Sequence, residues 1–219
     1  MRPFKTKAAK TKAAAAVLMT LGLLGCARQG DIYERGILTT YTACPAVSIP
    51  APAGDITLFD PPASRDSTAI DVVATITNLR STCDESGEYI VTNATFDVHA
   101  QRRDNRGARE VVVPYFATVV QGGENVVAKK VRMIGLRFED GQYRTSTNGA
   151  ATSQVLRSAA TLPEDIRRQI TRERRAGDPS AAIDPLSDPA VRAAVERARF
   201  ELLVGFELDQ EQLRYNATR

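Results

Sequence analysis

After residue 69, hydrophobic and polar positions alternate along much of the chain, which is the pattern of β-strands with one buried face. The clearest stretches span residues 70–77, 90–99 and 200–208. In the second stretch, the alternation predicts that Phe96 and Val98 point inward and that His99 points outward. Half-buried strands of this kind predict a β-rich domain.

A hairpin is predicted in the middle of the chain. Residues 111–121 and 126–139 are two long strand-like runs, and residues 122–125 between them have the sequence Gly-Gly-Glu-Asn, which is typical of a turn. Pro114 lies in the first run and favours an edge strand or a bulge, because proline cannot donate a ladder hydrogen bond. A short strand at 142–145 is expected to follow the second run.

The alternation stops at residue 146, and two helices are predicted before it returns at residue 200. The first helix is expected to run to about Arg175. It has few apolar anchors, namely Leu162, Ile166 and Ile170, so we expect it to be mobile or to dock on a surface outside this chain. The second helix is expected to begin at Asp188-Pro189, with Asp188 as the N-cap and proline in the first turn.

The number and order of these elements suit a mainly β protein. About seven strands, six before the helical stretch and one after it, predict an antiparallel β-sandwich of immunoglobulin or fibronectin type, which covers residues 44–219. The helices would form an insertion at residues 159–199, before the last strand. Prolines interrupt residues 45–68, so strands there should be short or at an edge. An α+β sheet with helices on one face is the alternative.

The first 25 residues have a different character from the rest. They contain five basic residues and no acid, and the thirteen residues from Ala13 to Gly25 carry no charge. A cationic start, a short apolar run and a small residue before Cys26 are typical of a secretory signal peptide. A transmembrane helix needs roughly 20 apolar residues, so the run is too short to cross a bilayer.

The residues Leu23-Leu24-Gly25-Cys26 resemble the lipobox of bacterial lipoproteins. The resemblance implies that residues 1–25 are removed and that Cys26 is acylated, with palmitate among the chains, which anchors the protein in the lipid bilayer. Residues 26–43 would then form a tether. In such lipoproteins an aspartate after the cysteine signals retention in the inner membrane, so Ala27 favours the outer membrane, with the domain facing the periplasm. The alternative is an ordinary secretory signal that leaves Cys26 as a free thiol.

Removal of the leader changes the charge of the protein. The full chain has 29 Lys and Arg against 26 Asp and Glu, but five of the bases lie in residues 1–25. The remaining chain has 24 bases and 26 acids, a net charge near −2, which gives no support for a nucleic-acid partner.

Two cysteines remain beside Cys26, and an even pair in an exported protein indicates a disulfide between Cys44 and Cys83. Closing that loop would stabilise the fold by roughly 4 kcal/mol in the chain-entropy model. Two free buried thiols are the alternative. A metal site is not expected, because two isolated cysteines and one distant histidine are a poor ligand set.

The sequence offers little support for catalysis, and no catalytic residue or cofactor is predicted. His99 is the single histidine and is expected on an outward face, and no Gly-x-Ser-x-Gly motif is present. The adjacent acids Asp84 and Glu85 are expected to be solvated at a turn. One cluster of charge stands out on the first predicted helix: Arg167, Arg168, Arg172, Arg174 and Arg175. They could contact anionic lipid head groups or an acidic partner, or form an ordinary solvated face.

These observations predict a membrane-anchored lipoprotein of the bacterial cell envelope that is not an enzyme and that binds or scaffolds another envelope protein. A binding module for envelope glycan or lipopolysaccharide is the alternative, although the chain has no Trp. A hydrolase of envelope polymers is a weaker third possibility.

Overall fold

The computed structural model describes residues 32–33, 36–37, 42–172 and 177–218. The chain divides into two compact units, residues 1–39 with 172–182 and residues 40–171 with 183–219. In the first unit, the described elements are an antiparallel pair of short strands and one 3-10 turn: β1 (Ile32–Tyr33), β2 (Gly36–Ile37) and η4 (Pro179–Ala182). The predicted signal peptide of residues 1–25 and most of the predicted tether of residues 26–43 lie outside the described residues.

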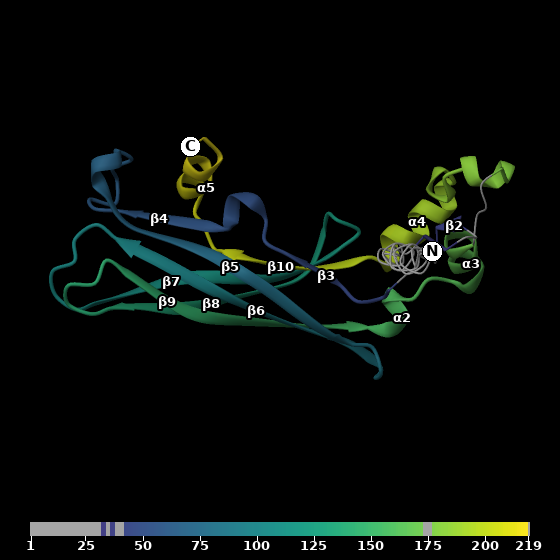
Figure 1. The fold of residues 1–219 in the computed structure, drawn as a ribbon, viewed down its shortest axis with the longest axis horizontal. Coiled ribbons are helices and arrows are strands. Elements are labelled where there is room, and N and C mark those ends of the chain that lie inside the picture. Colours follow the sequence, from purple (N-terminus) through teal and green to yellow (C-terminus); the bar gives the residue numbers. More distant parts are fainter. Residues whose placement is uncertain (1–31, 34–35, 38–41, 173–176, 219) are drawn as a thin grey trace, which may run out of the picture. The chain divides into compact units, whose positions relative to one another are not determined.

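Two four-stranded sheets form the second unit, and Figure 1 shows their strands in two layers. The first sheet has the order β3 (Ala46–Ser48), β10 (Phe200–Phe206), β7 (Arg109–Gln121) and β8 (Asn125–Phe138). The second has the order β4 (Asp55–Phe59), β5 (Ile70–Asp84), β6 (Tyr89–Arg102) and β9 (Arg144–Leu156). Neighbouring strands are antiparallel except for β3 and β10, which are parallel.

The predicted mainly β sandwich is therefore confirmed, and the immunoglobulin or fibronectin type stays a prediction. The helical elements of the second unit are η2 (Ala51–Ala53), η3 (Ser67–Ala69), α2 (Arg157–Ala160), α3 (Glu164–Thr171), η5 (Pro185–Ser187), α4 (Pro189–Ala198) and α5 (Gln210–Thr218). The two predicted helices, α3 and α4, come between β9 and the last strand, β10. The short helix α2 was not predicted, and α3 ends at Thr171, before the expected Arg175. The prolines before residue 68 leave β3 and β4 short, and both lie at sheet edges.

One hydrophobic core joins the two sheets. Along β6, every second residue from Ile90 to Arg102 is buried, so this strand presents one continuous face to the opposite sheet. The ring of Phe96 on β6 meets the ring of Tyr115 on β7 edge to face, with centroids 5.4 Å apart. The Tyr115 hydroxyl donates to the carbonyl oxygen of Ala150 on β9 over 3.0 Å. Burial of each such aromatic side chain contributes about 1.5–3 kcal/mol.

The strand β9 corrects the expectation that strand structure ends at residue 146. It continues to Leu156 and pairs with the whole of β6, from Tyr89 opposite Leu156 to Gln101 opposite Arg144. The alternation in β9 is weak because most of its inward residues, such as Gly149, Ala151 and Ser153, are small or polar. A Cβ at Gly149 would lie only 2.2 Å from Cζ of Phe96, so the Phe96 ring occupies the space that a side chain would need.

The expectation that Pro114 marks an edge or a bulge is wrong. Its strand, β7, lies inside the sheet between β10 and β8, and the register shift of the hairpin falls at Val119/Val120 instead. Proline is tolerated because the pairing with β10 ends at Tyr115, one residue away. The Pro114 carbonyl still accepts a hydrogen bond from the Glu207 amide over 3.0 Å, and only the returning donor is missing.

The helix α3 docks within the chain, contrary to the expectation of a mobile or externally docked helix. Leu162, just before α3, is buried with Ala194 and Ala198 of α4, and Ile166 and Ile170 pack against them. The helix α4 has the predicted N-cap, since Asp188 Oδ1 accepts from the Ala190 amide over 2.8 Å. The few apolar anchors of α3 therefore suffice, because α4 supplies the complementary apolar face.

Candidate functional site

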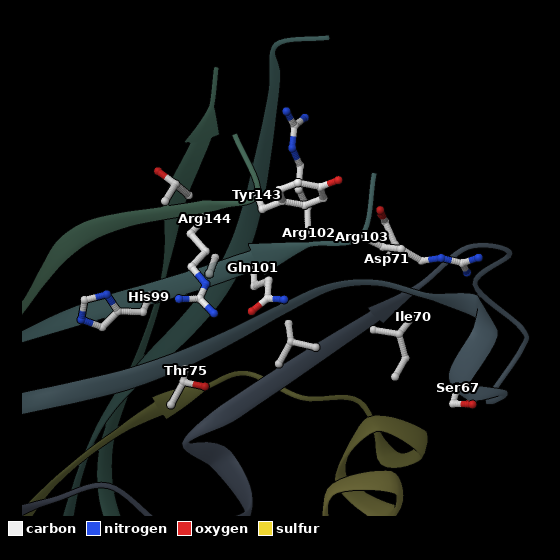
Figure 2. A pocket seen from close by; sticks show the side chains of 13 residues that line it. Ser67, Ile70, Asp71, Thr75, His99, Gln101, Arg102, Arg103, Tyr143 and Arg144 are labelled. Atoms are coloured by element: carbon white, nitrogen blue, oxygen red, sulfur yellow. The ribbon is translucent and has the colours of Figure 1, made fainter. Parts of the chain in front are cut away.

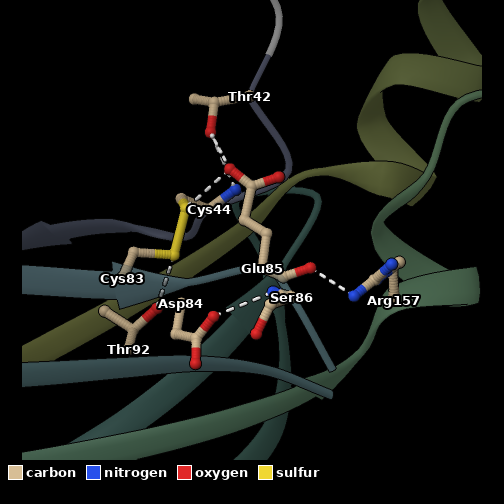
Figure 3. Close-up of a disulfide and its surroundings, with 8 residues drawn as sticks. All are labelled: Thr42, Cys44, Cys83, Asp84, Glu85, Ser86, Thr92 and Arg157. Atoms are coloured by element: carbon tan, nitrogen blue, oxygen red, sulfur yellow. Dashed lines mark hydrogen bonds between the residues drawn. A yellow bond between two sulfur atoms is a disulfide. The ribbon is translucent and has the colours of Figure 1, made fainter. Parts of the chain in front are cut away.

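The disulfide between Cys44 and Cys83 is present, as predicted, with Cα atoms 6.1 Å apart. Cys44 lies just before β3 of one sheet and Cys83 near the end of β5 in the other, so the bond links the two sheets (Figure 3). The hydroxyl of the buried Thr92, on β6, donates to Cys83 Sγ over 3.7 Å. The bond fixes the point at which the N-terminal segment enters the sandwich.

Polar contacts hold the entering chain against the turn between β5 and β6 (Figure 3). The Thr42 hydroxyl donates to Glu85 Oε1 over 3.0 Å and accepts from the Cys44 amide over 3.1 Å. The same Glu85 oxygen lies 3.1 Å from Cys44 Sγ, a contact and not a hydrogen bond, because a disulfide sulfur carries no hydrogen. Arg157 donates to the carbonyl oxygens of Glu85 and Gly87.

The same turn perturbs one carboxylate. The Ser86 amide donates to Asp84 Oδ1 over 2.8 Å, and with the Ser86 hydroxyl it lowers the pKa of Asp84 below its ordinary value. Hydrogen bonds to the charged form of a carboxyl group have this effect. Asp84 is exposed. This arrangement organises the turn between β5 and β6.

The predicted lipidation site, Cys26, lies outside the described residues. In the part of the chain that the structure describes, no helix has both the length and the apolar character needed to span a bilayer.

The predicted arginine patch is only partly described, because Arg174 and Arg175 lie outside the described residues. Arg167 is exposed and pairs with Glu164 of the same helix. Arg168 is also exposed, and its Nε donates to the Glu164 carbonyl oxygen over 3.4 Å. Arg172 is exposed and belongs to the first unit. The patch as an anionic contact stays a prediction.

A hollow of about 880 Å³ lies on the outer face of the β4-β5-β6-β9 sheet (Figure 2). The side chains that could contact a ligand there are those of Thr75, His99, Gln101, Arg103, Tyr143 and Arg144. Thr75 and His99 are cross-strand partners, as are Gln101 and Arg144, so alternate residues of three strands share this face. Figure 2 shows the Arg144 side chain along the same face as His99 and Gln101. His99 is exposed, as its outward position in the alternation predicted.

The residues that line the hollow include hydrogen-bond donors and arginines but only one carboxylate that could act as a general acid or base. Asp71 is the one acid among the residues that line it, and both of its carboxylate oxygens accept from Arg109, over 2.8 and 2.5 Å. The hydrogen bond from Arg109 to Asp71 raises the pKa of that arginine. Asp71 is thus engaged in an ion pair. Among the described residues, no group of three His, Cys, Asp or Glu is arranged to hold a metal ion.

Arg102 lies beside the hollow but acts in the core. Its side chain is 1% exposed and donates to four backbone carbonyl oxygens: Gln142 over 2.7 Å, Gly107 over 2.9 Å, Asn105 over 2.7 Å and Glu139 over 2.9 Å. Its guanidinium also lies over the Phe138 ring, 5.1 Å from the centroid. The polar, glycine-containing run of residues 102–108 predicts a connection between strands, and this prediction is wrong for Arg102, which is the last residue of β6. Its position in the inward series of β6, two residues after Ala100, was the signal.

Sequence reasoning did not single out Arg103, Tyr143 and Arg144. Arg103 lies in the connection predicted for residues 102–108, and Tyr143 and Arg144 lie in the short strand predicted for 142–145. Their common face appears only when β9 pairs along β6. Comparisons with protein-family models, with curated proteins and with solved structures found no match to this chain. Function therefore has to be argued from the residues themselves.

Proposed function

We propose that this protein is a lipid-anchored component of the bacterial cell envelope that binds another envelope protein and does not catalyse a reaction. The observation that carries the proposal is the bond between Cys44 and Cys83, because structural disulfides form in oxidising compartments outside the cytosol. It agrees with export through the leader and with a lipobox at residues 23–26.

The bond also suits a tethered domain. Seventeen residues separate Cys26 from Cys44, and an extended chain of that length reaches at most about 60 Å. An acylated Cys26 would hold one end of this segment at the bilayer, and the disulfide fixes the other end to both sheets. Two or more acyl chains are needed for stable anchoring, which is what a lipobox supplies. We propose the outer membrane, with the domain in the periplasm, on the basis of Ala27.

The absence of catalysis is proposed from the site chemistry. Asp71, the acid that lines the large hollow, is engaged by Arg109. His99 lines the hollow on the exposed face of a strand, where Thr75 is its cross-strand neighbour on β5. A general base needs an oriented partner, and none of these contacts supplies one.

The anchor is tested with Cys26→Ser in the natural host. The native protein should fractionate with outer membranes on a density gradient and should incorporate labelled palmitate. The variant should lose the label and leave the membrane fraction or keep its leader. Fractionation of Cys26→Ser with membranes at mature length, together with no palmitate in the native protein, would contradict the proposal.

The partner is tested by chemical crosslinking of intact envelopes followed by affinity purification of the full-length protein. A partner-binding protein should recover the same envelope protein in replicate preparations, and Cys26→Ser should reduce that recovery because it removes the protein from the membrane. Failure to recover any reproducible partner from crosslinked envelopes counts against a scaffold role.

A glycan or lipopolysaccharide ligand is a second candidate, and the hollow in Figure 2 favours it. Tyr143 is 52% exposed there, and Gln101 and Arg144 offer donors beside it, a combination that suits sugars with anionic groups. Peptidoglycan fragments and lipopolysaccharide should then raise the melting temperature of the native protein. Arg144→Ala should abolish that rise, whereas Arg80→Ala, on an exposed part of β5 outside the hollow, should not.

A further inference from the structure

The two sheets leave a cleft between the strands at their open edges. β8 ends the first sheet and β9 ends the second, and each is paired on one side only within the described residues. Between them lies a cleft of about 420 Å³. Val119 of β7, Leu202 of β10 and Ala151 of β9 give it apolar walls, and Lys130 and Arg132 of β8 line it as well.

The strand β8 is unusual for a sandwich edge because much of it is exposed on both faces. Every residue from Asn125 to Met133 is exposed, and the burial alternation begins only at Ile134. Met133 is 69% exposed and Val131 48%, on the face opposite the cleft. A long edge strand with apolar side chains and free backbone groups is a template for another strand.

The charges on β8 indicate what kind of strand would fit. Lys130 and Arg132 lie four and two residues before the buried Ile134. Alternate residues of a strand share a face, so both side chains are directed toward the cleft. Neither has an ion pair within the described part of the chain, whereas the neighbouring Lys129 pairs with Glu207 over 2.8 Å. β8 itself contains no acid. A second copy paired through β8 would therefore bring like charges together, and an acidic segment would neutralise them.

A buried hydroxyl indicates that the occupant is polar as well as apolar. Ser153 of β9 lines the cleft and is 3% exposed, and its Oγ has no hydrogen-bond partner. A buried polar group without a partner is costly, so a ligand that supplies a partner gains affinity. A hydrocarbon chain supplies no partner, but the backbone or a carboxylate of a polypeptide does.

We propose that the cleft between β8 and β9 binds an extended acidic segment of a partner protein. The segment pairs with β8 between Asn125 and Met133 as an added strand. It directs carboxylates to Lys130 and Arg132 in the cleft, and the side chains between those carboxylates lie on the opposite face, beside Val131 and Met133. This inference rests on the proposed partner-binding function and assigns a surface and a ligand chemistry to it.

The probe is a fluorescently labelled peptide as long as the exposed span of β8, in which valine alternates with glutamate. The full-length native protein in detergent should bind it saturably, and hydrogen exchange should show new protection of the amides of residues 125–133. A peptide with lysine in place of glutamate should bind at least tenfold more weakly. Lys130→Gln and Arg132→Gln should each weaken binding of the glutamate peptide by about five- to tenfold, since each removes one charge contact.

Arg137→Gln is the matched control, because it removes the same charge from an exposed residue of β8 that does not line the cleft. It should leave binding within about twofold, and Ser153→Ala should weaken binding while preserving the circular dichroism spectrum. Equal binding of both peptides, or no binding up to about 1 mM, overturns the proposal and indicates charges that only protect an edge. Binding of phosphatidylglycerol vesicles through Lys130 and Arg132, with no peptide binding, overturns it in favour of a lipid.

The failure of this inference can be told from the failure of the proposed function. In crosslinked envelopes, Lys130→Gln combined with Arg132→Gln should reduce recovery of the partner, whereas Arg137→Gln should not. Unchanged recovery would mean that the protein binds its partner through another surface. Loss of every reproducible partner in the native protein would remove the function itself.

Discussion

Replacement of Arg102 tests how far one buried side chain holds together the end of the sandwich. Its guanidinium donates to four backbone carbonyl oxygens from the segments that follow β6 and β8. A hydrogen bond to a charged group contributes about 1.5–3 kcal/mol, which would suggest a very large loss for Arg102→Met. Removal of the charge also removes its desolvation cost, so we expect a net loss of about 3–5 kcal/mol in the free energy of unfolding.

The measurement is urea unfolding followed by far-ultraviolet circular dichroism, because the chain contains no Trp to report by fluorescence. With an m-value of about 2–3 kcal/mol/M, the midpoint should fall by about 1–2 M. The free energy of unfolding of Arg102→Lys should lie between those of the native protein and Arg102→Met, because an ammonium group keeps the charge but cannot reproduce the planar fork of donors. The exposed neighbour Arg103 gives the control: Arg103→Met should stay within about 0.5 kcal/mol. A loss below about 1 kcal/mol for Arg102→Met would refute the reasoning.

Three further changes test other parts of the structure. Reduction of the disulfide should lower the free energy of unfolding by about 4 kcal/mol, given its sequence separation of 39, and an unchanged urea midpoint with reductant would contradict this. Gly149→Ala should destabilise the protein by about 1–3 kcal/mol because the new Cβ meets the Phe96 ring, and a double-mutant cycle should show a smaller cost with Phe96→Leu. The pKa of Asp104 in NMR titrations should lie below its ordinary value of 3.8, because side-chain and backbone hydrogen bonds from Arg106 lower it. Arg106→Gln should raise that pKa only part of the way, because the backbone amide remains. Since the folded pKa is the lower one, any stabilisation from this pair is present above pH 4 and is lost on acidification.

Several features of the fold could be predicted because they depend on local patterns. The alternation in β6 and β10 determined which residues are buried, since a one-residue shift would expose every apolar side chain of the strand. The N-cap at Asp188 depends on one side chain and the amide two residues on. The pairing of Cys44 with Cys83 followed from there being two cysteines beside Cys26.

Other features depend on neighbours that are distant in the sequence. β9 has a glycine at position 149 because the ring of Phe96, more than fifty residues earlier, occupies the space that a side chain would need. The docking of α3 depends on the apolar face of α4, which its own three anchors do not reveal. The hollow on the second sheet combines side chains from β5, β6 and β9, so no single stretch of sequence contains it.

The sequence by itself determined the class of fold, the start of α4 at Asp188 and the disulfide, because hydrophobic alternation, capping and cysteine number are properties of short segments or of composition. Only the tertiary structure decided that Arg102 is buried, that α3 docks on α4 and that Lys130, Arg132 and Ser153 share one cleft. The physical reason is the same in each case. Burial and charge depend on which strands become neighbours, and that choice is made by packing of the whole sandwich.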